Sequence, residues 1–295
     1  MELWIVFTLL AVVMQSVRTA GQKHIAKRLS IPATTLVRFL FGLPFALLYF
    51  FSLKRYYGVA ALGVDSNLIV PATLAGISQI FATVFLVKAL TIRNFAVGTA
   101  LAKTEAIMTA LIGAWFFAAA LSVIGYLSVV VGVIGVLVAS NWRISLRDLV
   151  ENESIKYGLG AGLGFALASL WIRDASLSLE IPRVMSAAVV LVYMVALQTV
   201  ICFIWILVNE RQQFRLIVDN FAPASFIGFT SVAGSIGWFT AMSLQNAALV
   251  KTLGQVEFAV TLLITYFYFG ERITAREYLG ISLVAISVLL LLASP

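Results

Sequence analysis

Long apolar runs alternate with short polar connections along the whole chain. Each run is long enough to cross a hydrocarbon core about 30 Å thick as an α-helix, which satisfies its own backbone hydrogen bonds there. The pattern therefore predicts an all-α membrane protein with ten transmembrane helices. The predicted spans are 3–21, 33–53, 68–90, 95–117, 122–140, 157–176, 184–208, 223–244, 247–269 and 277–293.

Composition agrees with this pattern. Of the 295 residues, 62% are hydrophobic and 11% are charged, and the mean hydropathy is +1.03, whereas about a quarter of the residues in a soluble domain are charged. The longest polar connections, 141–156 and 209–220, leave no room for a soluble domain. The first run lacks a preceding basic segment and carries Arg18 where a cleavage site would fall, so we interpret it as a retained helix.

The net charge of +7 is spread over short loops, which indicates membrane orientation and argues against nucleic acid as a partner. By the positive-inside rule, the loop charges place both termini outside. Eleven basic residues fall on one side, Lys23, Lys27, Arg28, Arg93, Arg143, Arg147, Lys156, Arg211, Arg215, Arg272 and Arg276, and four on the other, Lys54, Arg55, Arg173 and Arg183.

The sequence contains an internal repeat. Residues 89–137 align without a gap with residues 241–289 and share 14 identities in 49 positions, where this composition would give about 5 by chance. We therefore predict two five-helix repeats, 1–140 and 157–295, joined by a linker at 141–156. Because five crossings are an odd number, the second repeat is inverted relative to the first, a design that transporters use to alternate access.

Two acidic residues lie well inside predicted spans. Glu105 is midway along the fourth span and Glu257 midway along the ninth, and the repeat aligns one with the other. A charge at that depth costs about 3 kcal/mol, so it normally faces protein or a water-filled path. We expect both glutamates to belong to a central site, and the alternative is a structural ion pair between helices. Buried glutamates carry protons in many transporters, so protons are candidate partners.

Polar residues near the glutamates recur at helical spacing. Thr99 and Lys103 are four residues apart and would share one face of a continuous helix. Lys251 and Gln255 repeat that spacing in the second half. We expect these four side chains to face the same cavity as the glutamates.

The partners of the two glutamates must come from other helices. Lys103 and Glu105 are two residues apart and would point about 200° away from each other on a helix. Candidate partners are Arg18, Arg38 and Lys88. Arg18 and Lys88 have an alternative role, because lysine and arginine near a helix end also extend to the membrane interface.

Trp238 lies midway in the eighth span and is a candidate wall of the same pocket, with Gln79, Ser231 and Ser235 as expected neighbours. The alternative is an interfacial anchor, because tryptophan is common at the bilayer surface. Gly160 and Gly164 have GxxxG spacing, which favours close packing of helices.

Residues 241–292 carry a longer pattern: the end of one helix, a polar link, the helix of Glu257, the sequence GERIT at 270–274 and a final helix. This order resembles the repeat of the EamA-like transporter family, a branch of the drug/metabolite transporter superfamily. Arg38–Phe39 and Ile31–Pro32 resemble first-half features of that family. The resemblance covers nearly the whole chain and implies a ten-helix transporter with a central cavity that opens alternately to the two sides.

The chain departs from the family in two places. Family members often have proline after the glutamate, where this chain has Phe258, so the helix break that the resemblance implies need not occur here. GER occurs only in the second half, since the first has Ala118–Ala120. The resemblance also implies cytoplasmic termini, in conflict with the loop charges, so the orientation stays open.

We interpret the chain as a multi-pass cell-membrane transporter, with export as the expected direction, for a small metabolite such as an amino acid or amine. The mixture of Lys103, Gln255 and two carboxylates suits a zwitterion better than a sugar phosphate, which needs a cluster of basic groups. The alternative is a carrier of lipids or lipid-linked amphiphiles. A monomer and a homodimer are both compatible with the sequence.

Enzymatic activity is not expected. The chain has one histidine, no HExxH motif and only scattered aspartates, so the usual metal-dependent membrane chemistries lack their ligands. Cys202 is the only cysteine, which excludes an internal disulfide and a CxxC metal site. We therefore expect neither a metal nor a cofactor.

Overall fold

The computed structural model describes residues 2–59, 63, 65–91, 101–140, 153–260 and 274–293. Most of the predicted linker, Thr99 and the end of the ninth predicted span lie outside these residues. All regular elements in the described part are helices. They are α1 (Leu3–Ile25), α2 (Ile31–Leu40), α3 (Leu43–Tyr57), α4 (Ser66–Thr91), α6 (Glu105–Phe116), α7 (Val123–Ala139), α9 (Glu153–Leu177), α10 (Arg183–Asn209), α11 (Gln213–Asp219), α12 (Phe221–Leu244), α13 (Ala247–Leu253), the 3₁₀ turn η1 (Gly254–Val256) and α15 (Ala275–Leu292).

Seven segments of the described part are long and apolar enough to cross a membrane, and α6 and α7 are shorter apolar helices. Large apolar side chains are exposed on the outside of these helices, among them Phe51, Trp115 and Val208. Such extensive apolar exposure is typical of a surface that contacts lipid. The chain is therefore a multi-pass membrane protein.

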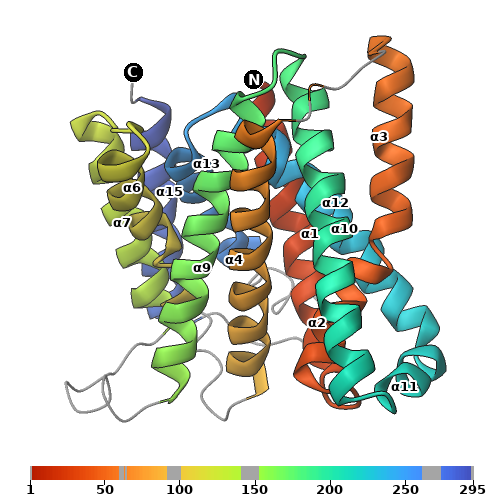
Figure 1. Ribbon diagram of the computed structural model, residues 1–295. Helices are drawn as coiled ribbons and strands as arrows, with labels where there is room; N and C mark the ends of the chain where they lie inside the picture. Colours follow the sequence, from red (N-terminus) through yellow and green to blue (C-terminus); the bar gives the residue numbers. More distant parts are fainter. Residues whose placement is uncertain are drawn as a thin grey trace.

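Three long helix pairs organise the bundle: α4 lies along α9, α1 along α12, and α7 along α15 (Figure 1). Exchanging the two halves would replace α1 by α9 and α12 by α4, so the first two pairs are equivalent. In Figure 1, α1 descends from the N-terminus, α9 rises in the opposite direction, and both termini lie at the same end of the bundle.

Small residues allow two of these pairs to approach closely. A Cβ on Gly164 of α9 would lie 2.9 Å from the Cβ of Ala82 on α4, and a Cβ on Gly237 of α12 would lie 2.5 Å from the carbonyl oxygen of Phe7 on α1. Larger side chains at these positions would separate the helices. The GxxxG spacing thus serves packing inside the bundle, as the sequence indicated.

The second predicted span, 33–53, is not one straight helix. Its residues form α2 and α3, which are separated at Phe41–Gly42 within one apolar segment, Ile31–Tyr57. Pro44 lies in the first turn of α3, where its missing N–H is tolerated but a continuous helix would be broken. Two boundaries also differ, because α9 begins at Glu153, inside the predicted linker, and the polar connection 209–220 contains α11.

Candidate functional site

The stretch that carries Lys103 and Glu105 is interrupted. Leu101 and Ala102 are helical, Lys103 and Thr104 form a turn, and α6 begins at Glu105. The backbone N–H of Thr104 donates to the carbonyl oxygen of Leu101 at 3.0 Å, and its hydroxyl donates to the same oxygen at 2.7 Å. These local bonds replace the regular α-helical pattern, so the expectation of a continuous helix at this point is wrong.

The second half has a matching interruption. The helix α13 ends at Leu253, the 3₁₀ turn η1 follows, and helical backbone resumes at Glu257. A Cβ on Gly254 would lie 2.3 Å from Cη2 of Trp238, so the turn depends on the missing side chain. The break implied by the family resemblance therefore occurs just before Glu257, although Phe258 replaces the family's proline.

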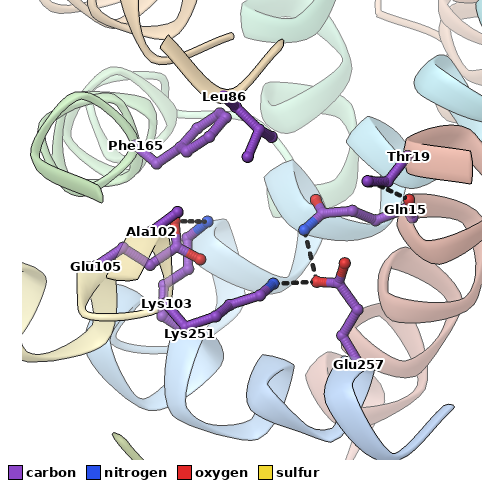
Figure 2. Close-up of a pocket in the computed structure, with 9 residues that line it drawn as sticks. All are labelled: Gln15, Thr19, Leu86, Ala102, Lys103, Glu105, Phe165, Lys251 and Glu257. Atoms are coloured by element: carbon purple, nitrogen blue, oxygen red, sulfur yellow. Dashed lines mark hydrogen bonds and ion pairs between the residues drawn. The ribbon is translucent and has the colours of Figure 1, made fainter. Parts of the chain in front are cut away.

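A cavity of about 60 Å³ lies between the two interruptions (Figure 2). That volume holds only a few water molecules. Figure 2 shows Glu105 and Glu257 on opposite sides of this cavity. The lining residues are Gln15, Thr19, Leu86, Ala102, Lys103, Glu105, Phe165, Lys251 and Glu257.

Lys103 of the first half forms an ion pair with Glu257 of the second half. The same carboxylate oxygen of Glu257 accepts a hydrogen bond from Nε2 of Gln15 at 2.7 Å. The side-chain oxygen of Gln15 in turn accepts from Nε1 of Trp238 at 2.9 Å. One chain of polar contacts thus connects α12, α1 and both halves of the protein.

Lys251 of the second half pairs with Glu105 of the first half, with 3.3 Å between Nζ and Oε2. The ammonium group of Lys251 also lies 4.5 Å from the centre of the Trp238 ring system and 5.8 Å from the Phe165 ring. Aromatic faces attract cations, so both rings support the buried charge. The side chains of Lys251 and Lys103 are 7% and 20% exposed, which makes the second pair the more deeply buried.

The three residues predicted as partners of the glutamates lie elsewhere. Arg18 is buried on α1, close enough to both glutamates for the charges to interact, but it forms no ion pair in the described part of the chain. Lys88 lies near the end of α4, 5.9 Å from the ring centre of Tyr157. Arg38 lines a second cavity.

The second cavity, of about 20 Å³, adjoins the first. Gln15, Phe165 and Lys251 line both cavities. Arg38 is 4% exposed, and its Nη1 donates to the hydroxyl of Thr83 at 2.6 Å. The remaining lining residues are Gln79, Ala168, Ser169, Ile172, Ser235, Trp238, Phe239 and Met242.

Gln255 points away from the first cavity. Its side chain is buried against α7, where a Cβ on Gly132 would lie 2.0 Å from its Oε1, and near Ser287 of α15. The 3₁₀ turn explains this placement, because it changes the angle between Lys251 and Gln255 from that of a regular helix. Thr99 lies outside the described residues.

Five lining residues were absent from the sequence prediction: Gln15, Thr19, Leu86, Ala102 and Phe165. Gln15 and Thr19 belong to a polar stripe of α1 with Arg18 and Gln22, at spacings of three and four residues inside an apolar run. That spacing marks one helix face, so the stripe could have been recognised. Phe165 gives no comparable signal in a sequence rich in phenylalanine.

The chain as a whole is similar to known proteins in sequence family and in fold. None of the curated proteins matches the sequence. A solved structure, "Crystal structure of protein", has a TM-score of 0.73 with 12% sequence identity over 97% of this chain and 94% of that one. At this identity the likeness shows the fold alone. The EamA-like transporter family matches the chain twice, over residues 2–141 and 153–293. The two matches cover nearly the whole sequence and confirm the resemblance and the repeat, so the chain belongs to the EamA-like transporter family.

Proposed function

We propose that this protein is a secondary transporter that moves a small, charged metabolite of the amino-acid type across the cell membrane by alternating access. The observation that carries the proposal is the buried cavity between the two helix interruptions, with two ion pairs that each join one repeat to the other. Ionisable groups at such depth are expensive to bury and are typical of transport pathways.

The proposed architecture has ten membrane-crossing segments in two inverted repeats, 1–140 and 157–295. The equivalence of the pairs α1–α12 and α4–α9 supports it, as do the opposite directions of α1 and α9 (Figure 1). In such a protein the two repeats rock against each other around a fixed site, and each can adopt the conformation of the other.

The ion pairs would couple substrate binding to this movement. A cavity of about 60 Å³ is too small for an amino acid, so the described conformation must open before the substrate enters. A substrate with charged groups can replace one partner of each pair and thereby loosen the contact between repeats. The two pairs would re-form once the substrate leaves, which returns the carrier to its closed conformation.

The charged and amide-containing walls favour a small polar solute over a lipid-linked one. An amine without a negative group fits poorly, because both glutamates already have lysine partners. We propose export as the direction of transport and the plasma membrane as the location. The protein would act there as a monomer or a homodimer.

Proton coupling is part of this proposal and has a structural requirement. A proton that neutralises Glu105 or Glu257 would remove the ionic attraction to its lysine, so proton uptake would favour opening of the ion pair. The substitutions Glu105→Gln and Glu257→Gln would imitate the protonated side chains.

Exchange in proteoliposomes tests the function. Purified protein in vesicles preloaded with one amino acid should accumulate the labelled form of a transported amino acid, while protein-free vesicles should not. An imposed proton gradient should change the rate in the native protein and leave the rate of a Glu257→Gln variant unchanged. Absence of exchange for amino acids, organic acids and amines alike would contradict the proposal.

A further inference from the structure

We propose that Arg38 forms an anion-binding subsite in the second cavity and takes the carboxylate group of the transported solute. This inference rests on the proposed transport function and makes the substrate class more specific. A solute bearing a carboxylate, either an organic acid or an amino acid, is required, and its neutral amide is rejected.

The surroundings of Arg38 leave a positive charge without an anionic partner. A guanidinium group has five N–H donors, and in the described part of the chain the polar contact of Arg38 is the hydroxyl of Thr83. The ring centre of Phe39 lies 5.2 Å from the guanidinium carbon and carries no formal charge. A buried charge of this kind is costly unless an opposite charge binds it.

The balance of buried charges points to the same kind of ligand. Arg18, Arg38, Lys103 and Lys251 bring four positive charges to the region around the two cavities. The two glutamates described there are each occupied by a lysine. Arg18 also lies close enough to Arg38 for their like charges to interact. A negatively charged ligand group would relieve this repulsion.

The other walls of the second cavity suit a carboxylate. The hydroxyl of Ser235 can donate a hydrogen bond, and the amide oxygen of Gln79 accepts a bond from Nε2 of Gln198 at 2.8 Å. This bond assigns the amide oxygen of Gln79 to Gln198 and leaves its N–H groups as donors. A planar guanidinium can hold both oxygens of a carboxylate, which a hydroxyl or an ammonium group cannot match.

The residues that line both cavities indicate where the rest of the solute would lie. Gln15, Phe165 and Lys251 separate the Arg38 cavity from the one that holds the glutamates. Movement of Gln15 and Phe165 would join the two cavities into one elongated site. A carboxylate at Arg38 would then place an amino group of the same solute on the side of Glu105 and Glu257.

The test compares each acid with its own neutral amide. The probes are amino acids and small mono- and dicarboxylates, each paired with its carboxamide, for example alanine with alaninamide. Proteoliposome exchange measures transport, and thermal unfolding of the purified protein with each probe measures binding separately. The native protein should prefer the best acid over its amide by at least about tenfold, the size of effect expected when a buried charge loses its partner.

The variant Arg38→Gln should reduce that preference to near one, while Arg38→Lys should retain part of it. Arg28→Gln is the matched control, because Arg28 is a basic residue that lies outside both cavities and donates to Asn220 at 3.0 Å. If Arg38→Gln does not fold, the charge-retaining Arg38→Lys variant decides the question, since it should weaken acid binding by about tenfold without weakening amide binding.

Equal recognition of acid and amide by the native protein would overturn the subsite, and so would an unchanged preference in a folded Arg38 variant. These results differ from a failure of the transport function. Acid-specific stabilisation that depends on Arg38, without exchange of any probe, would contradict transport and support the subsite. Transport that does not distinguish acid from amide would support transport and contradict the subsite.

Discussion

The two repeats place a glutamate at the same position but supply its partner from different positions. Glu105 and Glu257 are equivalent in the sequence repeat, whereas the residue equivalent to Lys103 is Gln255. An exactly symmetric pair would therefore join Gln255 to Glu105. The structure instead pairs Glu105 with Lys251, and Gln255 packs against α7.

This difference makes the two ion pairs unequal. Lys251 is almost fully buried near two aromatic rings, while Lys103 comes from a partly buried turn and shares its glutamate with Gln15. Water screens an exposed pair more strongly and solvates its partners when it breaks. We infer that the Lys103–Glu257 contact opens first and that the Lys251–Glu105 contact holds the repeats together longer.

Removing the buried cation should have the largest effect. Lys251→Met leaves Glu105 buried without its partner, and we expect a loss of about 3–5 kcal/mol in the free energy of unfolding. Reversible unfolding in mixed micelles measures this change. The double variant Lys251→Met/Glu105→Gln is the control and should recover most of the loss. Native-like stability of the single variant would contradict the unequal roles of the two pairs.

The second interruption should be sensitive to volume. Gly254→Ala places a Cβ within 2.3 Å of the Trp238 ring and should cost about 1–3 kcal/mol, because the ring has to move. The equivalent residue of the first half is already an alanine, Ala102. Ala102→Gly is therefore the matched control and should cost less. The free energy of unfolding measures the loss of stability, and tryptophan fluorescence reports movement of the Trp238 ring. Equal losses of stability in both variants would count against a Trp238-dependent turn.

Removing the more exposed lysine should cost less than removing the more deeply buried one. Lys103→Met should lower stability by about 1–2 kcal/mol, because Gln15 still donates a hydrogen bond to the Glu257 carboxylate. Measured beside Lys251→Met in the same micelles, it gives the difference between the pairs directly. A larger loss for Lys103→Met than for Lys251→Met would reverse the proposed order of opening.

The smallest effect should come from removing the side-chain amide of Gln15, which connects α1 to Glu257 and to Trp238. Gln15→Met removes the bond to Glu257 and the acceptor of Trp238, while it keeps a side chain of similar size. We expect a loss of about 1 kcal/mol together with a change in tryptophan emission. The same emission change in a Trp238→Phe background would show that the signal comes from another tryptophan.

Apolar run length was enough to predict the membrane class, and the pattern of residues 241–292 led to the correct family. The local backbone could not be predicted. A continuous helix placed Lys251 and Gln255 on one face, but the 3₁₀ turn at Gly254–Val256 separates them. That turn depends on contact with Trp238, which comes from another helix and leaves no local signal in the sequence.

The partners of the charges show a second limit. Periodicity identifies which residues lie deep in a helix, but it does not say which helix faces which. Arg18 and Arg38 were reasonable partners for the glutamates by depth, yet the lysines of the opposite repeat occupy them. Pairing across the repeats requires the three-dimensional arrangement of α6 and α13.

Accessibility of the central cavity from the two sides of the membrane tests alternating access most directly. Cys202 is the only cysteine, so Cys202→Ser gives a cysteine-free protein into which Thr19→Cys introduces one thiol at the cavity wall. Thr8→Cys, on the same helix but fully buried, is the control and should react from neither side. With a membrane-impermeant maleimide applied separately to right-side-out and inside-out vesicles, we predict that Cys at position 19 reacts from both sides and that a transported solute slows both reactions. Reaction from one side only, with and without solute, would contradict alternating access at this site.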